Sequence, residues 1–295
     1  MEKRTLGNTG MAVTVLGYGG AEIGFQDVPA DTVGRLINSA LDAGLNVIDT
    51  AECYIDSEQK IGEAVSHRRS EYFLFTKCGH DKDEDHWNPQ KMAQQIDRSL
   101  KRLRTDRVDL VQLHSCSEEL LRKGDVIEVV QRARDAGKTR FIGYSGDSRA
   151  ALYAVECGAF DTLQISVSIA DQESIDLVLP RAKARNMGVI VKRPIANAAW
   201  KSSEKPANAY HHVYWERLKQ LDYPFLKTPL KDAIATALRF TLSHDVHTAI
   251  VGTTQPGRWA ENSAMLQAGP LEPSQINEIR TRWKAVAQPD WVGQT

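Results

Sequence analysis

Short apolar stretches rich in β-branched residues alternate with longer segments of helical periodicity along most of the chain. A run of five or six such residues that lies between turn signals is typical of a buried strand. Eight of these runs occur, at residues 14–19, 46–50, 72–77, 109–114, 140–145, 161–166, 188–193 and 247–252. A regular alternation of strands and helices predicts a parallel sheet covered by helices.

Helical spacing of apolar residues marks the segments between and after these strands. The clearest are residues 31–43, 89–103, 120–136 and 272–287. We expect Asp31 to cap the first of them and Pro89 to occupy the first helical position of the second. Gly137 is expected to end the third, since glycine readily adopts the left-handed conformation that follows many helices.

The pattern predicts an α/β fold, a (β/α)8 TIM barrel with an N-terminal β-hairpin and a C-terminal extra helix, in one domain over residues 1–295. A doubly wound open sheet is the alternative, but no G-x-G-x-x-G or P-loop follows the first strand. The hairpin would turn at Asn8-Thr9-Gly10 and could plug the bottom of the barrel. The irregular segment 196–229 is interpreted as a loop insertion after the seventh strand.

Composition narrows the range of partners. The 295 residues carry a net charge of −1, which favours neither nucleic acid nor an anionic membrane. The apolar runs are too short to span a bilayer, and the start MEKRTLGNTG has no signal-peptide core. We therefore expect a soluble cytoplasmic protein. The sequence leaves its oligomeric state open.

Ionisable residues end three successive predicted strands: Asp49, Lys77 and His114. Tyr54 follows the first of them closely. In a parallel barrel the carboxyl ends of the strands meet at one mouth, so these four side chains should lie together. A nearby ammonium would lower the pKa of a tyrosine and make it a usable general acid. This set suits protonation of a carbonyl oxygen while a hydride reaches its carbon.

The cysteines leave a second possibility open. Cys53, Cys78 and Cys116 could form a metal site with His80 or His86, although the chain has no CxxC pair and no zinc-ligand spacing. A metal-dependent barrel hydrolase would need such a site. Without a secretory signal, reduced thiols are expected, and we predict that no metal is bound.

Several motifs in the same order resemble the aldo-keto reductase family. DTAECYIDSE, from Asp49, matches the family's D-T-A-x-x-Y-x-x-S-E run, with Ile55 where glycine is usual. FTKCG, VQLHS and the longer LKRLRTDRVDLVQLH resemble the segments that carry the family's lysine and histidine. The resemblance extends from Arg4 to about Ala268.

The resemblance implies a role for each of the four residues. Tyr54 would be the proton donor, Asp49 and Lys77 the pair that tunes it, and His114 the residue that orients the substrate. It also implies a nicotinamide cofactor, NADPH/NADP+ with NADH as an alternative, bound without a Rossmann fold, and a small-molecule carbonyl substrate. Because potassium-channel β subunits also resemble this family, a regulatory or sensor subunit that binds NADP(H) is the alternative function.

The fifth, sixth and seventh strands supply candidates for the nicotinamide. Ser145 and Gln164 could bind its carboxamide, although Gly146 stands where the family usually has asparagine, with Asp147 as a partial substitute. Lys192 stands where an aromatic ring often stacks, and its stem or Arg193 could cover the nicotinamide instead.

Two further segments resemble the parts of the family that bind the rest of the cofactor. The first, on the pyrophosphate side, contains Pro194, Ile195 and Asn197. The second, GTTQPGRWAEN, opens a helix whose N–H groups favour phosphate, and its candidate residues are Gly252, Thr253, Arg258, Glu261 and Asn262. Arg258 is the expected partner of the 2′-phosphate, whereas Gly252 replaces the family's common lysine.

The substrate pocket is predicted to include Glu22, Ile23, Trp87 and part of residues 198–224. Glu22 would favour hydroxylated or cationic substrates, and aromatic walls would suit an apolar body. The natural substrate is not legible from these residues.

Overall fold

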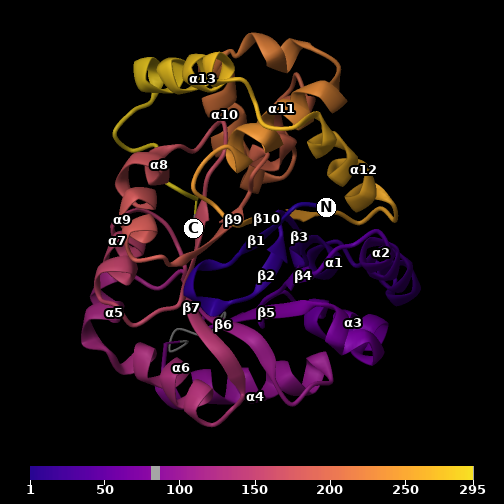
Figure 1. Cartoon of the computed structure of the whole chain (residues 1–295), viewed down its shortest axis with the longest axis vertical. Helices are drawn as coiled ribbons and strands as arrows, with labels where there is room; N and C mark the ends of the chain where they lie inside the picture. The colour runs from indigo at the N-terminus through magenta and orange to yellow at the C-terminus, as the bar shows by residue number, and fades with distance from the viewer. Residues whose placement is uncertain (81–86, 295) are drawn as a thin grey trace.

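The computed structural model, which describes residues 1–80 and 87–294, contains a closed barrel of eight parallel strands (Figure 1). The strands follow one another around the barrel in chain order, and the last pairs with the first. They are β3 (Leu16–Gly19), β4 (Val47–Asp49), β5 (Phe73–Cys78), β6 (Val108–His114), β7 (Thr139–Ser145), β8 (Thr162–Ser166), β9 (Gly188–Lys192) and β10 (Thr248–Gly252). The predicted (β/α)8 fold and all eight strands are confirmed.

Helices cover the outside of the barrel. They are α1 (Ala21–Phe25), α2 (Ala30–Asp42), α3 (Ser57–Val65), α4 (Pro89–Leu103), α5 (Glu118–Lys123), α6 (Asp125–Asp135), α7 (Ser148–Glu156), α8 (Glu173–Leu177), α9 (Leu179–Ala184), α10 (His212–Leu221), α11 (Leu230–Leu242), α12 (Arg258–Met265) and α13 (Pro273–Val286). The extra C-terminal helix is α13. Within the described residues, no helix has both the length and the apolar character needed to cross a bilayer.

Two details of the helix predictions were wrong. Asp31 does not cap α2, which begins after Pro29; it lies in the first turn and pairs with Arg35 at 2.7 Å. The helix expected over 120–136 is two helices, α5 and α6, because Gly124 adopts φ 86° between them. Gly137, with φ 75°, does follow the end of α6 as expected.

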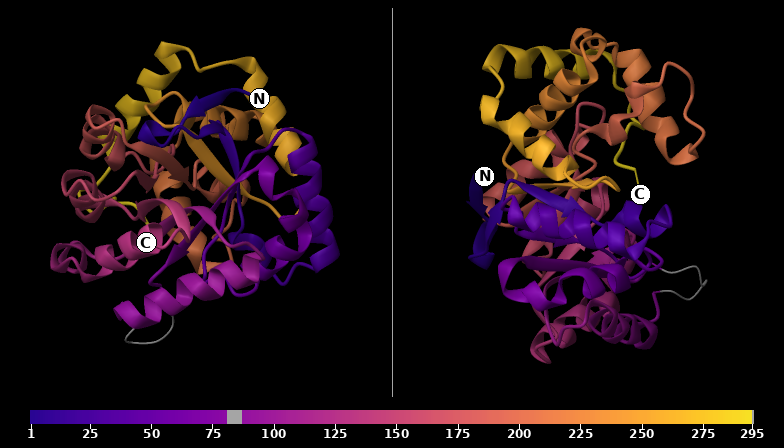
Figure 2. Two further views of the ribbon diagram at one scale, coloured as in Figure 1. Left: turned by 60° about the horizontal axis from the view of Figure 1, so that its bottom comes forward. Right: turned by 90° about the vertical axis from the view of Figure 1, so that its right-hand side faces the viewer.

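The N-terminal hairpin closes the end of the barrel where the strands begin. Its strands β1 (Lys3–Thr5) and β2 (Ala12–Thr14) pair with each other and not with the barrel. The apolar side chains of the hairpin form one buried cluster with residues from inside the barrel: Leu6, Met11, Val13, Val47, Phe75, Leu110, Ile190 and Ile250. Figure 2 shows the hairpin and the C-terminus on opposite sides of the molecule.

Polar side chains replace this apolar layer towards the other end of the strands. Side chains alternate between the two faces of a strand, so every second residue faces the barrel interior. Along β5, Phe75 belongs to the buried apolar cluster of the hairpin, and Lys77, two residues later, is hydrogen-bonded inside the barrel. Leu110 and Gln112 repeat the arrangement on β6.

The segment 196–229 has a hydrophobic core of its own. It contains 3₁₀ helices at Ala196–Lys201, Ala209–His211 and Pro224–Lys227 besides α10. Its buried side chains Tyr214 and Leu218 form a second cluster with Trp283 of α13 and with Trp291. The predicted insertion is therefore a packed layer joined to the C-terminal part of the chain (Figure 1).

Candidate active site

A buried ion pair occupies the centre of the barrel mouth. Asp49 ends β4, Lys77 lies next to the end of β5, and each side chain is 1% exposed. The Lys77 ammonium donates to Oδ1 of Asp49 and, at 2.8 Å, to the carbonyl oxygen of Thr50. A buried charge is stable only when it is paired and hydrogen-bonded, and here the two residues satisfy each other.

The remaining carboxylate oxygen of Asp49 accepts two amide hydrogen bonds. Gln164 donates to Oδ2 at 2.8 Å and Gln112 at 3.3 Å, and Ser145 donates to the side-chain oxygen of Gln164 at 3.0 Å. Ser145 and Gln164 are thus tied to the ion pair in this structure. Gln112 was missed by the sequence reasoning, although its position two residues before His114 places it on the same face of β6.

The turn after β4 positions the tyrosine. Thr50 and Ser57 hydroxyls lie 2.9 Å apart, and Ser57 donates to the carbonyl oxygen of Gly20 at 2.7 Å. Glu58 accepts a hydrogen bond from Thr76 at 2.6 Å. These bonds explain the serine and glutamate of DTAECYIDSE as structural groups that hold the turn. Ile55 is exposed and has φ 54°, a region that strains a β-branched residue.

Tyr54 lies between Lys77 and His114. The Lys77 ammonium is 5.2 Å from the centre of the Tyr54 ring, and the ring of His114 meets it edge-on at 5.7 Å. Burial raises the pKa of the Tyr54 phenol well above its usual range, and the Asp49 carboxylate adds to the rise. The expected net lowering of this pKa was therefore wrong in direction, because burial of the phenol, the largest cause, raises it.

His114 is neutral in this environment. Burial lowers its pKa well below the usual value, and the neighbouring charges of Lys77 and Lys192 lower it further. The ring of His80 lies 5.4 Å from that of His114. The four residues expected at the mouth, Asp49, Tyr54, Lys77 and His114, are thus brought together.

A second charged network lies beside the first and is centred on Asp147. Its carboxylate accepts hydrogen bonds from the backbone N–H of Ser166 at 2.6 Å and the Ser166 hydroxyl at 3.1 Å. It also pairs with Lys192 at 3.0 Å and Arg193 at 3.3 Å. The pKa of Lys192 is lowered to about 8, chiefly by burial, although Asp147 opposes the change. Asp147 therefore offsets part of the positive charge of Lys192 and Arg193.

Residues 291–294 fold over this network. Arg193 donates to the carbonyl oxygen of Gln294 and, at 2.8 Å, to the Tyr210 hydroxyl. A Cβ added to Gly293 would lie 2.2 Å from the Asp147 carboxyl carbon, so only glycine fits there. The sequence reasoning did not anticipate this contact, which joins segments far apart in the chain.

The segment after β10 places the expected phosphate residues around the start of α12. Arg258 is 45% exposed and pairs with Glu261 at 2.6 Å and Gln255 at 2.7 Å. Asn262 is buried, and the Thr253 hydroxyl accepts from the backbone of Gln255 at 3.1 Å. Arg258 must exchange these partners if it is to contact a phosphate.

Glu22 lies against the end of β10. A Cβ added to Gly252 would be 1.7 Å from Oε2 of Glu22, so the carboxylate takes the room that a side chain would need. Burial raises the pKa of Glu22.

Trp87, another predicted pocket residue, packs on Gly79 just beyond β5, where a Cβ added to Gly79 would be 2.1 Å from the Trp87 ring. Ile23 is fully buried in the main core, which argues against a place in the pocket lining.

The loop after β9 contains buried donors that suit an anion. Arg193 and Asn197 have φ 57° and 55°, and such outliers cluster at binding sites. Among the described residues, Nδ2 of Asn197, Nε1 of Trp200 and Nε of Arg193 are buried without a hydrogen-bond partner. Pro194 accepts from Thr241 at 2.8 Å, and Ile195 is partly buried. Unpaired buried N–H groups fit the oxygens of a dinucleotide pyrophosphate.

The metal alternative receives no support from the described residues, where no three His, Cys, Asp or Glu side chains could hold a metal ion. His86 lies outside those residues.

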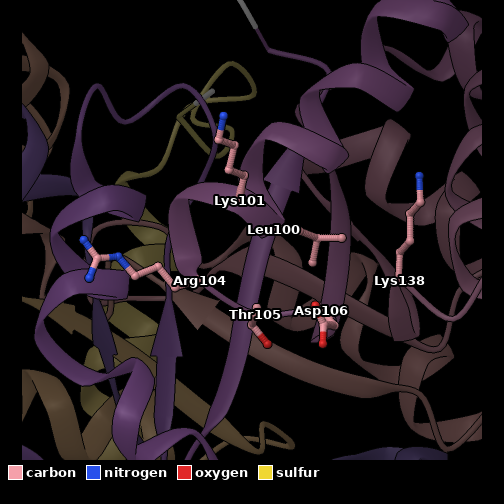
Figure 3. Close-up of a pocket in the computed structure, with 6 residues that line it drawn as sticks. All are labelled: Leu100, Lys101, Arg104, Thr105, Asp106 and Lys138. Atoms are coloured by element: carbon pink, nitrogen blue, oxygen red, sulfur yellow. The ribbon is translucent and has the colours of Figure 1, made fainter.

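A depression of about 520 Å³ is lined by Leu100, Lys101, Arg104, Thr105, Asp106 and Lys138 (Figure 3). It lies near the starts of β6 and β7, at the opposite end of the barrel from the four residues of the mouth.

Comparisons with known proteins agree with this architecture. The model of the aldo/keto reductase family matches residues 15–284, so the chain belongs to the aldo-keto reductases, a family of oxidoreductases. L-galactose dehydrogenase of Arabidopsis thaliana is 27% identical over 99% of this chain and 97% of its own length. D-threo-aldose 1-dehydrogenase of a Pseudomonas species is 25% identical over 86% of this chain and 89% of its own. The holo form of an aldo-keto reductase from Bacillus halodurans has a TM-score of 0.84 and 24% identity over 99% of both chains, which shows the common fold.

Proposed function

We propose that the chain transfers hydride reversibly between NADP(H) and a small carbonyl or alcohol substrate, with Tyr54 as the general acid. The observation that carries the proposal is the position of Tyr54, between the buried Asp49–Lys77 pair and a neutral His114. A bound nicotinamide would supply the hydride chemistry. The chain's own residues would bind the reactants, orient them and move the proton.

Proton transfer follows from the environment of the phenol. The raised pKa keeps Tyr54 protonated at neutral pH, so it can donate to a carbonyl oxygen. The phenolate formed by that step would lie near the Lys77 ammonium, which is 5.2 Å from the ring centre and whose field would stabilise the negative charge. His114 would donate a hydrogen bond to the same oxygen and orient it. In the oxidising direction the phenolate would accept the proton of the alcohol.

The remaining cofactor residues are assigned on the same basis. Ser145 and Gln164 would bind the nicotinamide carboxamide, and Lys192 with Arg193 would cover the ring. Unpaired donors on the loop with Pro194, Ile195 and Asn197 would hold the pyrophosphate. Gly252, Thr253, Glu261 and Asn262 would form the adenosine side, with Arg258 on the 2′-phosphate. NADH is the alternative, because Glu261 already pairs with Arg258.

The substrate class that we propose is a polyhydroxylated carbonyl compound or the cyclic hemiacetal of a sugar. The charged and hydroxyl groups of Asp147, Lys192, Arg193 and Tyr210 gather beside the catalytic residues and suit several hydroxyl groups. The names of the two relatives, both sugar dehydrogenases, support the same class.

The test compares wild type with Tyr54→Phe. We expect cofactor consumption with an aryl aldehyde, and oxidation of aldoses, to fall at least about a hundredfold in the variant, since a general acid contributes about that much. Cofactor binding, measured by fluorescence, should persist. Tyr153→Phe, on the outer helix α7, is the matched control and should keep the wild-type rate. A variant that retains most of its activity would remove Tyr54 from the mechanism, and an inactive wild type that binds cofactor would favour the sensor function.

A further inference from the structure

A thiol touches the histidine of the candidate active site. Cys53 lies directly before Tyr54 on the turn after β4, and its Sγ is 3.4 Å from Nδ1 of His114 on β6. This separation is within the range of a hydrogen bond that involves sulfur. Cys53 is partly buried, and its thiol is free. The mechanism described above gives it no role.

The protonation states of the two groups allow the thiol to be the donor of this hydrogen bond. Burial raises the pKa of the Cys53 thiol to about 12, so the sulfur keeps its proton at neutral pH. His114 is neutral, and a neutral imidazole has one nitrogen that donates and one that accepts. A thiol beside Nδ1 can therefore keep its proton and donate a hydrogen bond to the lone pair of that nitrogen.

We propose that Cys53 is a positioning residue that donates to Nδ1 of His114 and so fixes the imidazole tautomer with its proton on Nε2. Nε2 lies on the ring edge away from Cys53 and is then a donor. Such a donor can hold a carbonyl oxygen, whereas the other tautomer would present a lone pair to the oxygen and repel it. The second part of this inference rests on the proposed function, since it requires a substrate oxygen at His114.

The hydrogen bond is tested first without turnover. In ¹⁵N-labelled protein, imidazole NMR distinguishes a protonated ring nitrogen from an unprotonated one, and His114→Gln identifies the signals of His114. We expect unprotonated Nδ1 and protonated Nε2 in wild type and in Cys53→Ser, which keeps a donor. Cys53→Ala should show a mixture of tautomers. Cys157→Ala, which removes another partly buried thiol, one that donates to the carbonyl oxygen of Ala154, should leave the His114 signals unchanged.

Kinetics then test the consequence for the reaction. Cys53→Ala should lower kcat about threefold to tenfold, the range expected for one neutral hydrogen bond, with the KM for cofactor unchanged. Cys53→Ser should restore the rate to within about twofold of wild type. A protonated Nδ1 in wild type would overturn the proposal, and so would identical tautomers and kcat in wild type and Cys53→Ala. The wild-type spectrum decides the tautomer even if a variant does not fold or if the chain proves inactive, so the two proposals fail separately.

Discussion

Ile55 holds a strained backbone position directly beside the candidate general acid. Its φ of 54° is one that glycine adopts freely and a β-branched residue does not. Its side chain is 58% exposed, so little packing compensates for the strain.

We therefore expect Ile55→Gly to raise the free energy of unfolding by about 1 kcal/mol, because the left-handed region costs an L-residue roughly 1–2 kcal/mol. Urea denaturation measures the change. Ile55→Ala separates the loss of the side chain from the relief of strain, and it should give a much smaller gain. Equal effects of the two substitutions would show that the backbone angle is not the cause.

Arg258 is the single residue on which the preference for NADPH depends in our proposal. If it binds the 2′-phosphate, Arg258→Ala should weaken NADPH binding about tenfold or more and leave NADH binding unchanged, since a charge-assisted hydrogen bond is worth about 1.5–3 kcal/mol. Equilibrium fluorescence titration with both cofactors measures this. Lys219→Ala, at a basic residue of α10, serves as the control. An equal loss for both cofactors would contradict the assignment.

At the scale of elements, the hairpin turn shows how closely the plug fits the barrel. Gly7 has φ 51°, and a Cβ there would lie 2.2 Å from the backbone nitrogen of Gly188 at the start of β9. Gly10, in the same turn, has φ 71° but no atom within 4 Å of an added Cβ. The two glycines share a backbone region and differ in their surroundings.

Gly7→Ala should therefore lower the free energy of unfolding by roughly 3 kcal/mol or more, from backbone strain and from overpacking together. Gly10→Ala should cost only about 1 kcal/mol, from the strain alone. Thermal and urea denaturation of both variants provide the measurement. If the two losses were equal, the close contact between the hairpin and β9 would not contribute to stability.

The elements were predictable from sequence to the extent that their signals are local. The eight strands were found because each is a short apolar run, and Pro89 does begin α4, capped by Asn88. The break at Gly124 was missed because helical spacing continues on both sides of it. At the site, motif and strand end identified Asp49, Tyr54, Lys77 and His114. The Asp147 network and the rise in the pKa of Tyr54 depend on burial and on distant segments, which a local pattern does not contain.

At the scale of the whole molecule, the second hydrophobic core encloses a carboxyl group. Asp171 is fully buried, accepts a hydrogen bond from the Tyr214 hydroxyl at 3.1 Å, and has one oxygen, Oδ1, with no partner within the described residues. Burial, with Asp147 as the next cause, raises the pKa of Asp171 to about 7. Between about pH 4 and 7 the folded chain thus holds, wholly or in part, a proton that the unfolded chain releases.

The sign of the effect on stability follows from this difference. The contribution of Asp171 is fully present below the ordinary pKa near 3.8 and is lost as the pH rises through about 7. Asp171→Asn should therefore reduce the fall in unfolding free energy between about pH 5 and 8 by roughly 2 kcal/mol. Urea denaturation at both pH values tests this. Asp176→Asn, on the exposed end of α8, should keep the wild-type slope.

The apolar cluster between the hairpin and the barrel has a further consequence, for proton exchange at the site. Within the described residues, Leu6, Met11 and Val13 form a buried apolar cluster with residues inside the barrel, at the end opposite the mouth. Under the proposed function, protons that replenish Tyr54 would be expected to enter and leave through the mouth, where substrate and cofactor would also pass, because an apolar cluster does not conduct them. Occupancy of the mouth by substrate or cofactor would therefore slow the exchange of hydrogen between Tyr54 and solvent.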